Sequence, residues 1–84
     1  MQKTEEKIDL RLDVRNLMCP RPVLRAYKTL KKMEPGNVLE IIATARLTQY
    51  NIPYMVRMSG NELLAQEKTD AKEFRFLVKK VNPN

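Results

Sequence analysis

The sequence predicts an α/β two-layer sandwich, in which a mixed four-stranded sheet carries two helices on one face. Short alternating or β-branched apolar segments indicate strands, and two segments with apolar residues every three or four positions indicate helices. Turn residues separate these segments in the order β-α-β-α-β-β, which implies one sheet with both helices packed against it. The 84 residues form one domain, 1–84, ordered from about residue 7 to 81, with frayed ends in the first six and last three residues.

The first strand is predicted from Lys7 to Val14, because apolar and charged residues alternate there. Arg15-Asn16 then predicts a turn, since asparagine tolerates the left-handed backbone conformation. Charged residues of this strand and of the last strand are expected on the solvent-exposed face of the sheet. They are Asp9, Arg11, Asp13, Arg75 and Lys79.

The first helix is predicted to start just after Cys19. Pro20 and Pro22 fit its first turn, where a missing N–H is tolerated, but not its interior. The turn residues Glu34-Pro35-Gly36-Asn37 end it. Its expected buried face consists of Val23, Ala26, Tyr27, Leu30 and Met33.

A buried strand is predicted from Val38 to Ala43, followed by a helix from Leu47 to Ser59. Pro53 is expected to break or kink this helix and to push Ile52 toward extended geometry. The spacing of the larger apolar residues in the helix is typical of a core-facing side. They are Tyr50, Tyr54, Met55 and Met58.

The chain is predicted to close with a hairpin. A strand from Leu63 to Glu67 and a polar connection at residues 69–72 lead into the last strand, where Phe74, Phe76 and Val78 alternate with more polar residues. The following Lys79-Lys80 pair is predicted to be a solvated strand end. If the first two strands are parallel, the helix between them crosses over with right-handed connectivity.

Composition excludes several classes of chemistry. The absence of histidine removes Cys–His and Ser–His pairs and most zinc sites, and no cofactor or metal is expected. The single cysteine, Cys19, excludes an internal disulfide and favours a free thiol in the reducing cytoplasm, as does a charged N-terminus without an apolar leader. No apolar run approaches the roughly 18 residues that cross a bilayer. The net charge of +6 favours acidic partners.

Cys19 is the first candidate for a functional residue. At a helix N-terminus the macrodipole and unpaired N–H groups stabilise an anion by about 0.3–1 kcal/mol, which favours a thiolate without a general base. The competing interpretation is that Cys19 is a small buried hydrophobic residue.

The segment Cys19-Pro20-Arg21-Pro22 resembles the CPxP signature of the TusA (SirA-like) sulfur carriers, and the resemblance extends from about Leu10 to Lys80. It implies the β-α-β-α-β-β sandwich and a cysteine that accepts sulfane sulfur as a persulfide. Further matching segments are Leu12-Asp13, Leu17-Met18, Val23-Leu24, Lys28-Thr29-Leu30, Pro35-Gly36, Leu39 to Thr44, Ile52-Pro53, Asn61-Glu62-Leu63 and Phe76-Leu77-Val78-Lys79-Lys80.

The resemblance also implies two protein partners. A cysteine desulfurase or rhodanese-like protein would donate sulfur to Cys19, and an acceptor protein would receive it in tRNA thiolation, cofactor assembly or sulfur oxidation. The carrier would not itself be an enzyme. The alternative is a small basic RNA-binding or regulatory interaction module with an incidental thiol, although the strands lack paired exposed aromatics for base stacking.

Four basic residues of the first helix are predicted to bind the partners. Their spacing of four, three and four residues places them on one helix face about 60° wide, opposite the predicted buried face. No acidic residue interrupts this face, which begins beside Cys19. We call these residues the basic stripe: Arg21, Arg25, Lys28 and Lys32.

Overall fold

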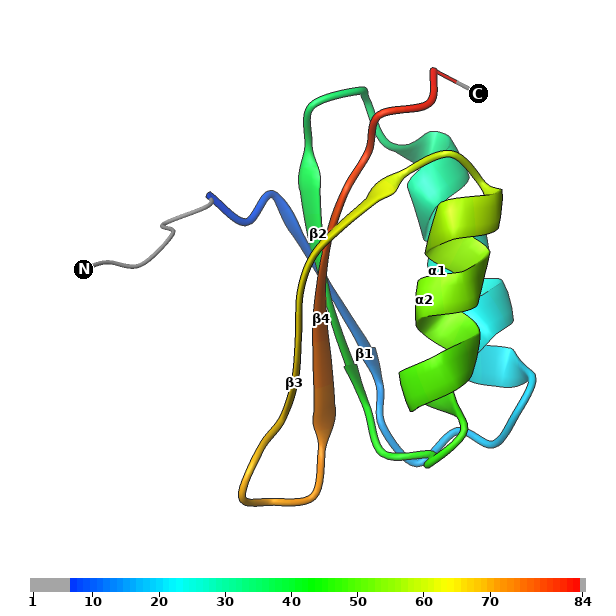
Figure 1. The fold of residues 1–84 in the computed structure, drawn as a ribbon, viewed down its shortest axis with the longest axis vertical. Helices are drawn as coiled ribbons and strands as arrows, with labels where there is room; N and C mark the ends of the chain where they lie inside the picture. Colours follow the sequence, from blue (N-terminus) through cyan, green and yellow to red (C-terminus); the bar gives the residue numbers. More distant parts are fainter. Residues whose placement is uncertain (1–6, 84) are drawn as a thin grey trace.

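Two helices lie side by side on one face of a four-stranded mixed sheet (Figure 1). The computed structural model describes residues 7–83, so the predicted fraying of the first six residues and of Asn84 falls outside the described residues. The predicted element order and two-layer architecture are confirmed. The elements are β1 (Leu10–Val14), α1 (Arg21–Lys32), β2 (Val38–Ala43), α2 (Thr48–Met58), β3 (Glu62–Lys68) and β4 (Phe74–Lys79).

The strands follow the spatial order β1-β2-β4-β3. β1 and β2 are parallel, with Leu12 opposite Ile41, whereas β4 is antiparallel to both β2 and β3. The carboxyl ends of β1 and β2 therefore lie at one end of the sheet, and both helices begin at that end (Figure 1). The loop with Cys19 connects β1 to α1 there.

The hydrophobic core lies between the helices and the sheet. Every second residue of β4 points toward the helices, because successive strand residues face opposite sides of a sheet. These side chains, with those of β1 and β2, meet apolar residues from both helices. The core residues with 0% exposure are Val14, Ala26, Leu39, Ile41, Ala43, Ile52, Phe76 and Val78.

Tyr27 was expected in the buried face of α1 but is 40% exposed. The centre of that face is formed by Pro22, Ala26 and Leu30, which are spaced by four residues. Tyr27 lies at the edge, where Lys31 Nζ is 5.6 Å from the centre of its ring. The other predicted residues of the face are buried or partly buried: Val23, Ala26, Leu30 and Met33.

The helix α2 turns a different face to the core from the one predicted. Two sets of residues with four-residue spacing run along this helix on roughly opposite sides, so spacing alone cannot identify the buried one. The buried set is Thr48, Ile52 and Val56. Of the residues expected in the core, Met55 packs partly against it, and the exposed ones are Tyr50 (66%), Tyr54 (58%) and Met58 (66%).

The predicted break at Pro53 is wrong, because α2 continues through this residue and Ile52 is helical. A proline inside a helix leaves the carbonyl four residues earlier without its N–H donor. Here that carbonyl belongs to Gln49, and it accepts a hydrogen bond from Gln66 Nε2 of β3 at 2.8 Å. A side chain from the sheet thus replaces the missing helical bond.

A row of alternating charges crosses all four strands on the outer face of the sheet. Arg11 Nε and Arg75 Nε each lie close to one carboxylate oxygen of Glu40, at 2.9 and 2.5 Å. Arg75 also pairs with Glu67 of β3 at 2.9 Å. Burial alone would raise the pKa of Glu40, but hydrogen bonds from Arg75 and Arg11 outweigh burial and lower that pKa.

We expect the substitution Glu40→Gln to make the stability less sensitive to acid. A carboxylate with a lowered pKa stabilises the fold above its unfolded pKa, and this contribution is lost as the pH falls through the folded pKa. At neutral pH the substitution should lower the free energy of unfolding by about 1.5 kcal/mol, as for one weak charge-assisted hydrogen bond. Well below the ordinary value of 4.5 the variant and the parent should converge in urea titrations. A difference that persists in acid would contradict this assignment.

Lys80 was predicted to be solvated, and this prediction is wrong. Lys80 is 1% exposed, and its Nζ donates a hydrogen bond to the carbonyl oxygen of Leu30 at 2.6 Å. Leu30 lies in the last turn of α1, and its carbonyl also accepts the backbone N–H of Met33. The carbonyl groups at a helix end carry a partial negative charge that a cation compensates. The backbone N–H of Lys80 also donates to the Asn37 carbonyl, so the chain after β4 is tied to the end of α1. Its neighbour Lys79 is half-buried.

Candidate functional site

The loop between β1 and α1 is fastened to the sheet before it reaches Cys19. The predicted left-handed turn is confirmed, since Asn16 has a φ of 68°. The backbone N–H of Asn16 donates to Thr44 Oγ1 at 2.8 Å, just beyond the end of β2. Leu17 packs against the core. These contacts fix the path of the loop toward Cys19.

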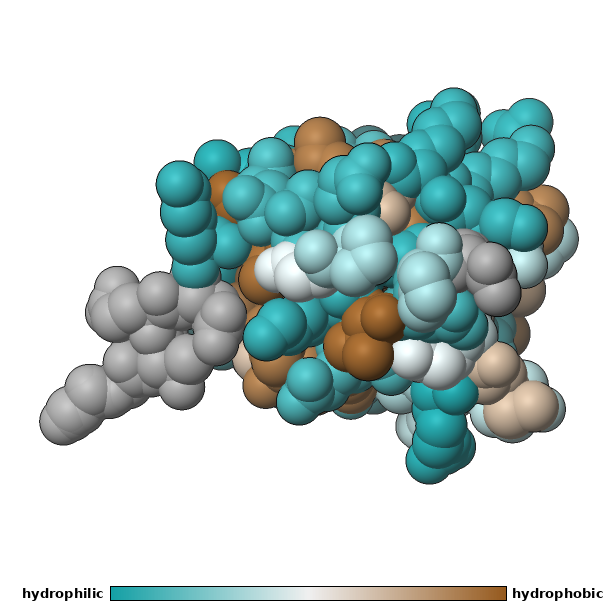
Figure 2. All heavy atoms as spheres, turned by 90° about the horizontal axis from the view of Figure 1, so that it is seen from above, coloured by the Kyte–Doolittle hydropathy of each residue, from teal (hydrophilic) through white to brown (hydrophobic). Residues whose placement is uncertain are grey.

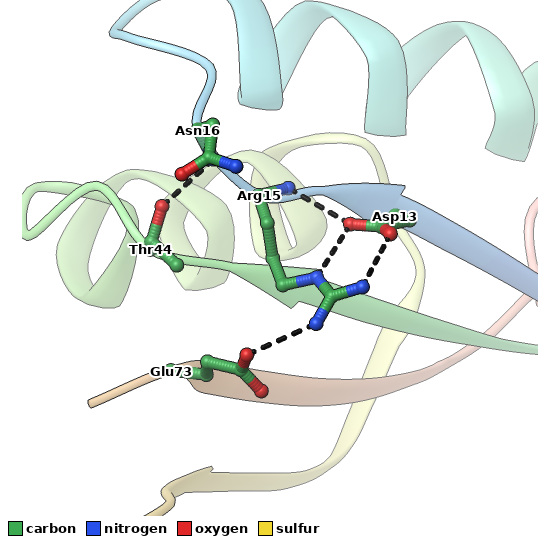
Figure 3. A pocket seen from close by; sticks show the side chains of 5 residues that line it. All are labelled: Asp13, Arg15, Asn16, Thr44 and Glu73. Carbon is green, nitrogen blue, oxygen red and sulfur yellow. Dashed lines mark hydrogen bonds and ion pairs between the residues drawn. The ribbon is translucent and has the colours of Figure 1, made fainter. Parts of the chain in front are cut away.

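Arg15 links the same loop to two other parts of the sheet (Figure 3). Its guanidinium lies 2.8 Å from a carboxylate oxygen of Asp13 and 3.1 Å from one of Glu73, just before β4. Hydrogen bonds from the side chain and backbone of Arg15 lower the pKa of Asp13 to about 2. Hydrogen bonds to Asp13 and Glu73 raise the pKa of Arg15. Because Asp13 and Arg15 are solvent-exposed, these pairs orient the loop more than they stabilise the fold.

Cys19 is exposed, and it lies one residue before the N-cap of α1. Pro20 is the N-cap, and Pro22 lies in the first turn with its ring buried. The peptide bond between Cys19 and Pro20 is cis. The interpretation of Cys19 as a buried packing residue is therefore wrong, because its side chain faces solvent.

The start of α1 offers fewer free N–H groups than the sequence suggested. Pro20 and Pro22 have no N–H, and that of Arg21 donates to the Met18 carbonyl at 2.9 Å. Within residues 7–83, Val23 carries the one first-turn N–H without a hydrogen-bond acceptor. The helix end can still favour an anion, but other donors become important.

Beside Cys19 lies an open, mostly apolar depression between the start of α1 and the exposed side of α2. It forms because both helices begin at the same end of the molecule and pack against each other. Around Cys19 the depression is lined by Pro20, Val23, Asn51, Tyr54, Met55 and Met58.

Asn51 of α2 contacts the sulfur of Cys19. Its Nδ2 donates a hydrogen bond to Cys19 Sγ at 3.6 Å, across an interval of 32 residues in the sequence. Sequence reasoning missed Asn51 because no motif marks it. Its role depends on the packing of α2 beside α1, which the sequence pattern does not specify in detail.

Exposed hydrophobic residues gather around this site. Met18 is 74% exposed directly before Cys19, and Tyr54 and Met58 expose a further part of the rim. The opposite end of the molecule, where both helices end, shows a mostly hydrophilic surface with small separate hydrophobic areas (Figure 2). Exposed apolar side chains clustered at one place on a small protein are typical of an interaction site.

All four residues of the basic stripe are exposed along α1. None of them forms an ion pair with the part of the chain that the structure describes. Lys31, which the prediction did not include, adds another exposed cation to the same helix. The stripe and the depression thus meet at Cys19, one charged and the other apolar.

The fold and the site define a small α/β protein that presents one exposed thiol between the starts of two helices. No group of three potential metal-ligating His, Cys, Asp or Glu side chains occurs within residues 7–83. None of the helices described is both long and apolar enough to span a bilayer.

Comparison with known proteins identifies the family. The family model described as sulfurtransferase TusA matches residues 10–80. The sulfur carrier protein TusA of Allochromatium vinosum is 42% identical over 72 residues, covering 86% of this chain and 93% of that protein. A putative sulfur carrier protein of Archaeoglobus fulgidus is 38% identical over 68 residues, covering 81% and 88%. The chain therefore belongs to the TusA family, and the predicted sulfur-carrier function is confirmed.

The fold agrees with a solved structure. The SirA-like protein of Desulfitobacterium hafniense superposes with a TM-score of 0.76 at 22% identity, covering 87% of this chain and 99% of that one. At this identity the likeness concerns the fold alone, and it supports the predicted SirA-like sandwich.

Proposed function

We propose that this sulfur carrier holds its sulfur as a persulfide on Cys19. In the loading step the Cys19 thiolate attacks the outer sulfur of a donor persulfide. A new S–S bond forms at Cys19, the donor S–S bond breaks, and its electron pair leaves on the donor thiolate, while the proton stays on the outer sulfur. In the delivery step an acceptor thiolate attacks that outer sulfur, which regenerates the Cys19 thiolate. The exposure of Cys19 carries this proposal, because in-line attack by a large partner needs an accessible sulfur.

The carrier needs no catalytic acid or base of its own. Thiol–persulfide exchange proceeds through thiolates, and its rate depends on the attacking and leaving thiols and on access. Among residues 7–83, those that line the depression around Cys19 are apolar or neutral, without a carboxylate or an amine. We infer that the protein acts as a single carrier domain and that the enzymatic steps belong to its partners.

The donor is a cysteine desulfurase or a rhodanese-like protein, and the acceptor is a protein with its own thiolate. Both generate or consume sulfane sulfur on cysteine, which matches the chemistry of Cys19. A single free thiol used in this way requires a reducing compartment, which supports a cytoplasmic location.

Sulfur loading can be tested by weighing the intact protein after incubation with a small polysulfane. We expect the mass of one added sulfur atom, which a reducing thiol then removes. An RNA-binding or regulatory module with an incidental thiol would not need a transferable sulfur, and a protein that stays unloaded would contradict the carrier proposal.

The basic stripe is proposed to bind both partners. Its exposed cations, which form no ion pair within residues 7–83, start beside Cys19. Opposite charges accelerate the encounter of two proteins more than they tighten the complex. Reversing Arg25 and Lys28 to glutamate should slow protein-to-protein sulfur transfer at least about tenfold at low salt, with a smaller effect at high salt. Stopped-flow or quenched transfer assays at two ionic strengths measure this.

A matched control separates local docking from overall charge. Reversing Lys7, which precedes β1, and Lys79 of β4 lowers the net charge by the same amount without changing either helix, and it should slow transfer much less. Loading by a small neutral polysulfane should be unchanged in both variants. Equal transfer rates for the two charge-reversed variants at low salt would show that partners do not dock on the stripe.

A further inference from the structure

We propose that Asn51 is a positioning residue for sulfur transfer, whose side-chain amide holds the Cys19 sulfur at the edge of the apolar depression. This inference rests on the proposed persulfide function. It adds a residue from α2 to a site that the sequence motif confines to the start of α1. The contact that carries it is the hydrogen bond from Asn51 Nδ2 to Cys19 Sγ at 3.6 Å.

The hydrogen bonds around Cys19 explain why its sulfur needs a side-chain donor. A thiolate at a helix start usually gains from several free N–H groups. Pro20 and Pro22 remove two of these groups, and the Met18 carbonyl occupies that of Arg21. Asn51 supplies a neutral amide donor in their place. Its half-buried position on α2 limits the directions in which the amide can point.

The surroundings of Asn51 suit the extra sulfur atom of a persulfide. Asn51, Met55 and Met58 lie three or four residues apart, so they occupy one side of α2, and all three line the depression with Val23. Sulfur is soft and polarisable, and it packs well against thioether and apolar side chains. With its inner sulfur held by Asn51, the persulfide lies with its outer sulfur over this apolar floor until a partner thiolate displaces it.

Alkylation of the unloaded thiol tests the contact without any sulfur donor. The rate of reaction with iodoacetamide is measured across pH for the parent, Asn51→Ala and Asn51→Asp. Loss of the donor should move the half-maximal rate to higher pH in Asn51→Ala. Asn51→Asp keeps the shape of the side chain but places a carboxylate against the thiolate. The pH at which the rate is half-maximal should therefore rise further, to about one pH unit above that of the parent.

The control is Asn37→Ala, the same substitution at the opposite end of the molecule, where no shift is expected. Circular dichroism verifies that each variant is folded, and the isosteric aspartate keeps the test valid if the alanine variant is unstable. The proposal is overturned if a folded Asn51→Ala shows no shift, or if Asn51→Asp does not give the highest pH of half-maximal rate. If the shifts occur in a protein that takes up no sulfur, the Asn51 contact is correct and the persulfide proposal is the one that fails.

Discussion

The variant Cys19→Ser is expected to take up no sulfur at all from a polysulfane or from a donor protein. Its hydroxyl oxygen cannot form the S–S bond of a persulfide, and the sequence contains no second cysteine that could replace it. This is the largest functional effect that we predict, because it removes the reacting atom instead of changing its surroundings. Intact mass spectrometry after incubation with donor measures it directly.

The same substitution should leave the fold unchanged. Cys19 is exposed and lies outside the core, and surface substitutions of this kind usually change the free energy of unfolding by less than about 0.5 kcal/mol. Urea denaturation of both proteins provides the control. Sulfur uptake by the folded serine variant, stable to washing and removed by a reducing thiol, would exclude Cys19 as the carrier.

The fold could be predicted from the sequence because its signals are local and agree with one another. Pro20 and Pro22 mark where α1 begins, and Pro35-Gly36 marks where it must have ended. The alternation of Phe74, Phe76 and Val78 with more polar residues places β4 with one face in the core. Each of these signals acts within a few residues, where chain geometry leaves little choice.

The errors arise where a distant residue decides the outcome. Pro53 is a valid helix-breaking signal, but Gln66 of β3 donates to the carbonyl that the proline leaves free. On α2, two sets of residues share the same four-residue spacing, and the sheet selects the β-branched set that includes Ile52. The large side chains that remain outside, such as Tyr54, then form the rim of the depression beside Cys19.

The candidate site shows the same division between features that local sequence specifies and contacts that distant residues decide. Four consecutive residues specify both Cys19 and the helix start that presents it. The basic stripe follows from the periodicity of the helix. The hydrogen bond from Asn51 to Cys19 joins residues 32 positions apart, and the ion pair of Arg15 with Glu73 joins residues 58 positions apart. No local pattern encodes such contacts, because they depend on how the two layers pack.

Lys80 offers the sharpest test of a packing contact that the sequence did not reveal. Lys80→Ala is expected to lower the free energy of unfolding by about 2–4 kcal/mol. The substitution removes a buried hydrocarbon stem and a charge-assisted hydrogen bond to the Leu30 carbonyl. For a domain of this size, that loss corresponds to a melting temperature roughly 10–20 °C lower. Lys79→Ala is the matched control, since Lys79 is only half-buried, and it should change the free energy of unfolding by less than about 0.5 kcal/mol.

A second variant, Lys80→Met, separates the two contributions of the lysine. Methionine keeps most of the apolar stem but cannot donate to the Leu30 carbonyl or compensate the partial negative charge at the end of α1. We therefore expect a stability between those of the parent and Lys80→Ala in urea denaturation. Burying an ammonium group also carries a desolvation penalty, which acts in the opposite direction. If Lys80→Met is more stable than the parent, this penalty exceeds the gain from the hydrogen bond and the helix dipole, and Lys80 does not stabilise α1 through its charge.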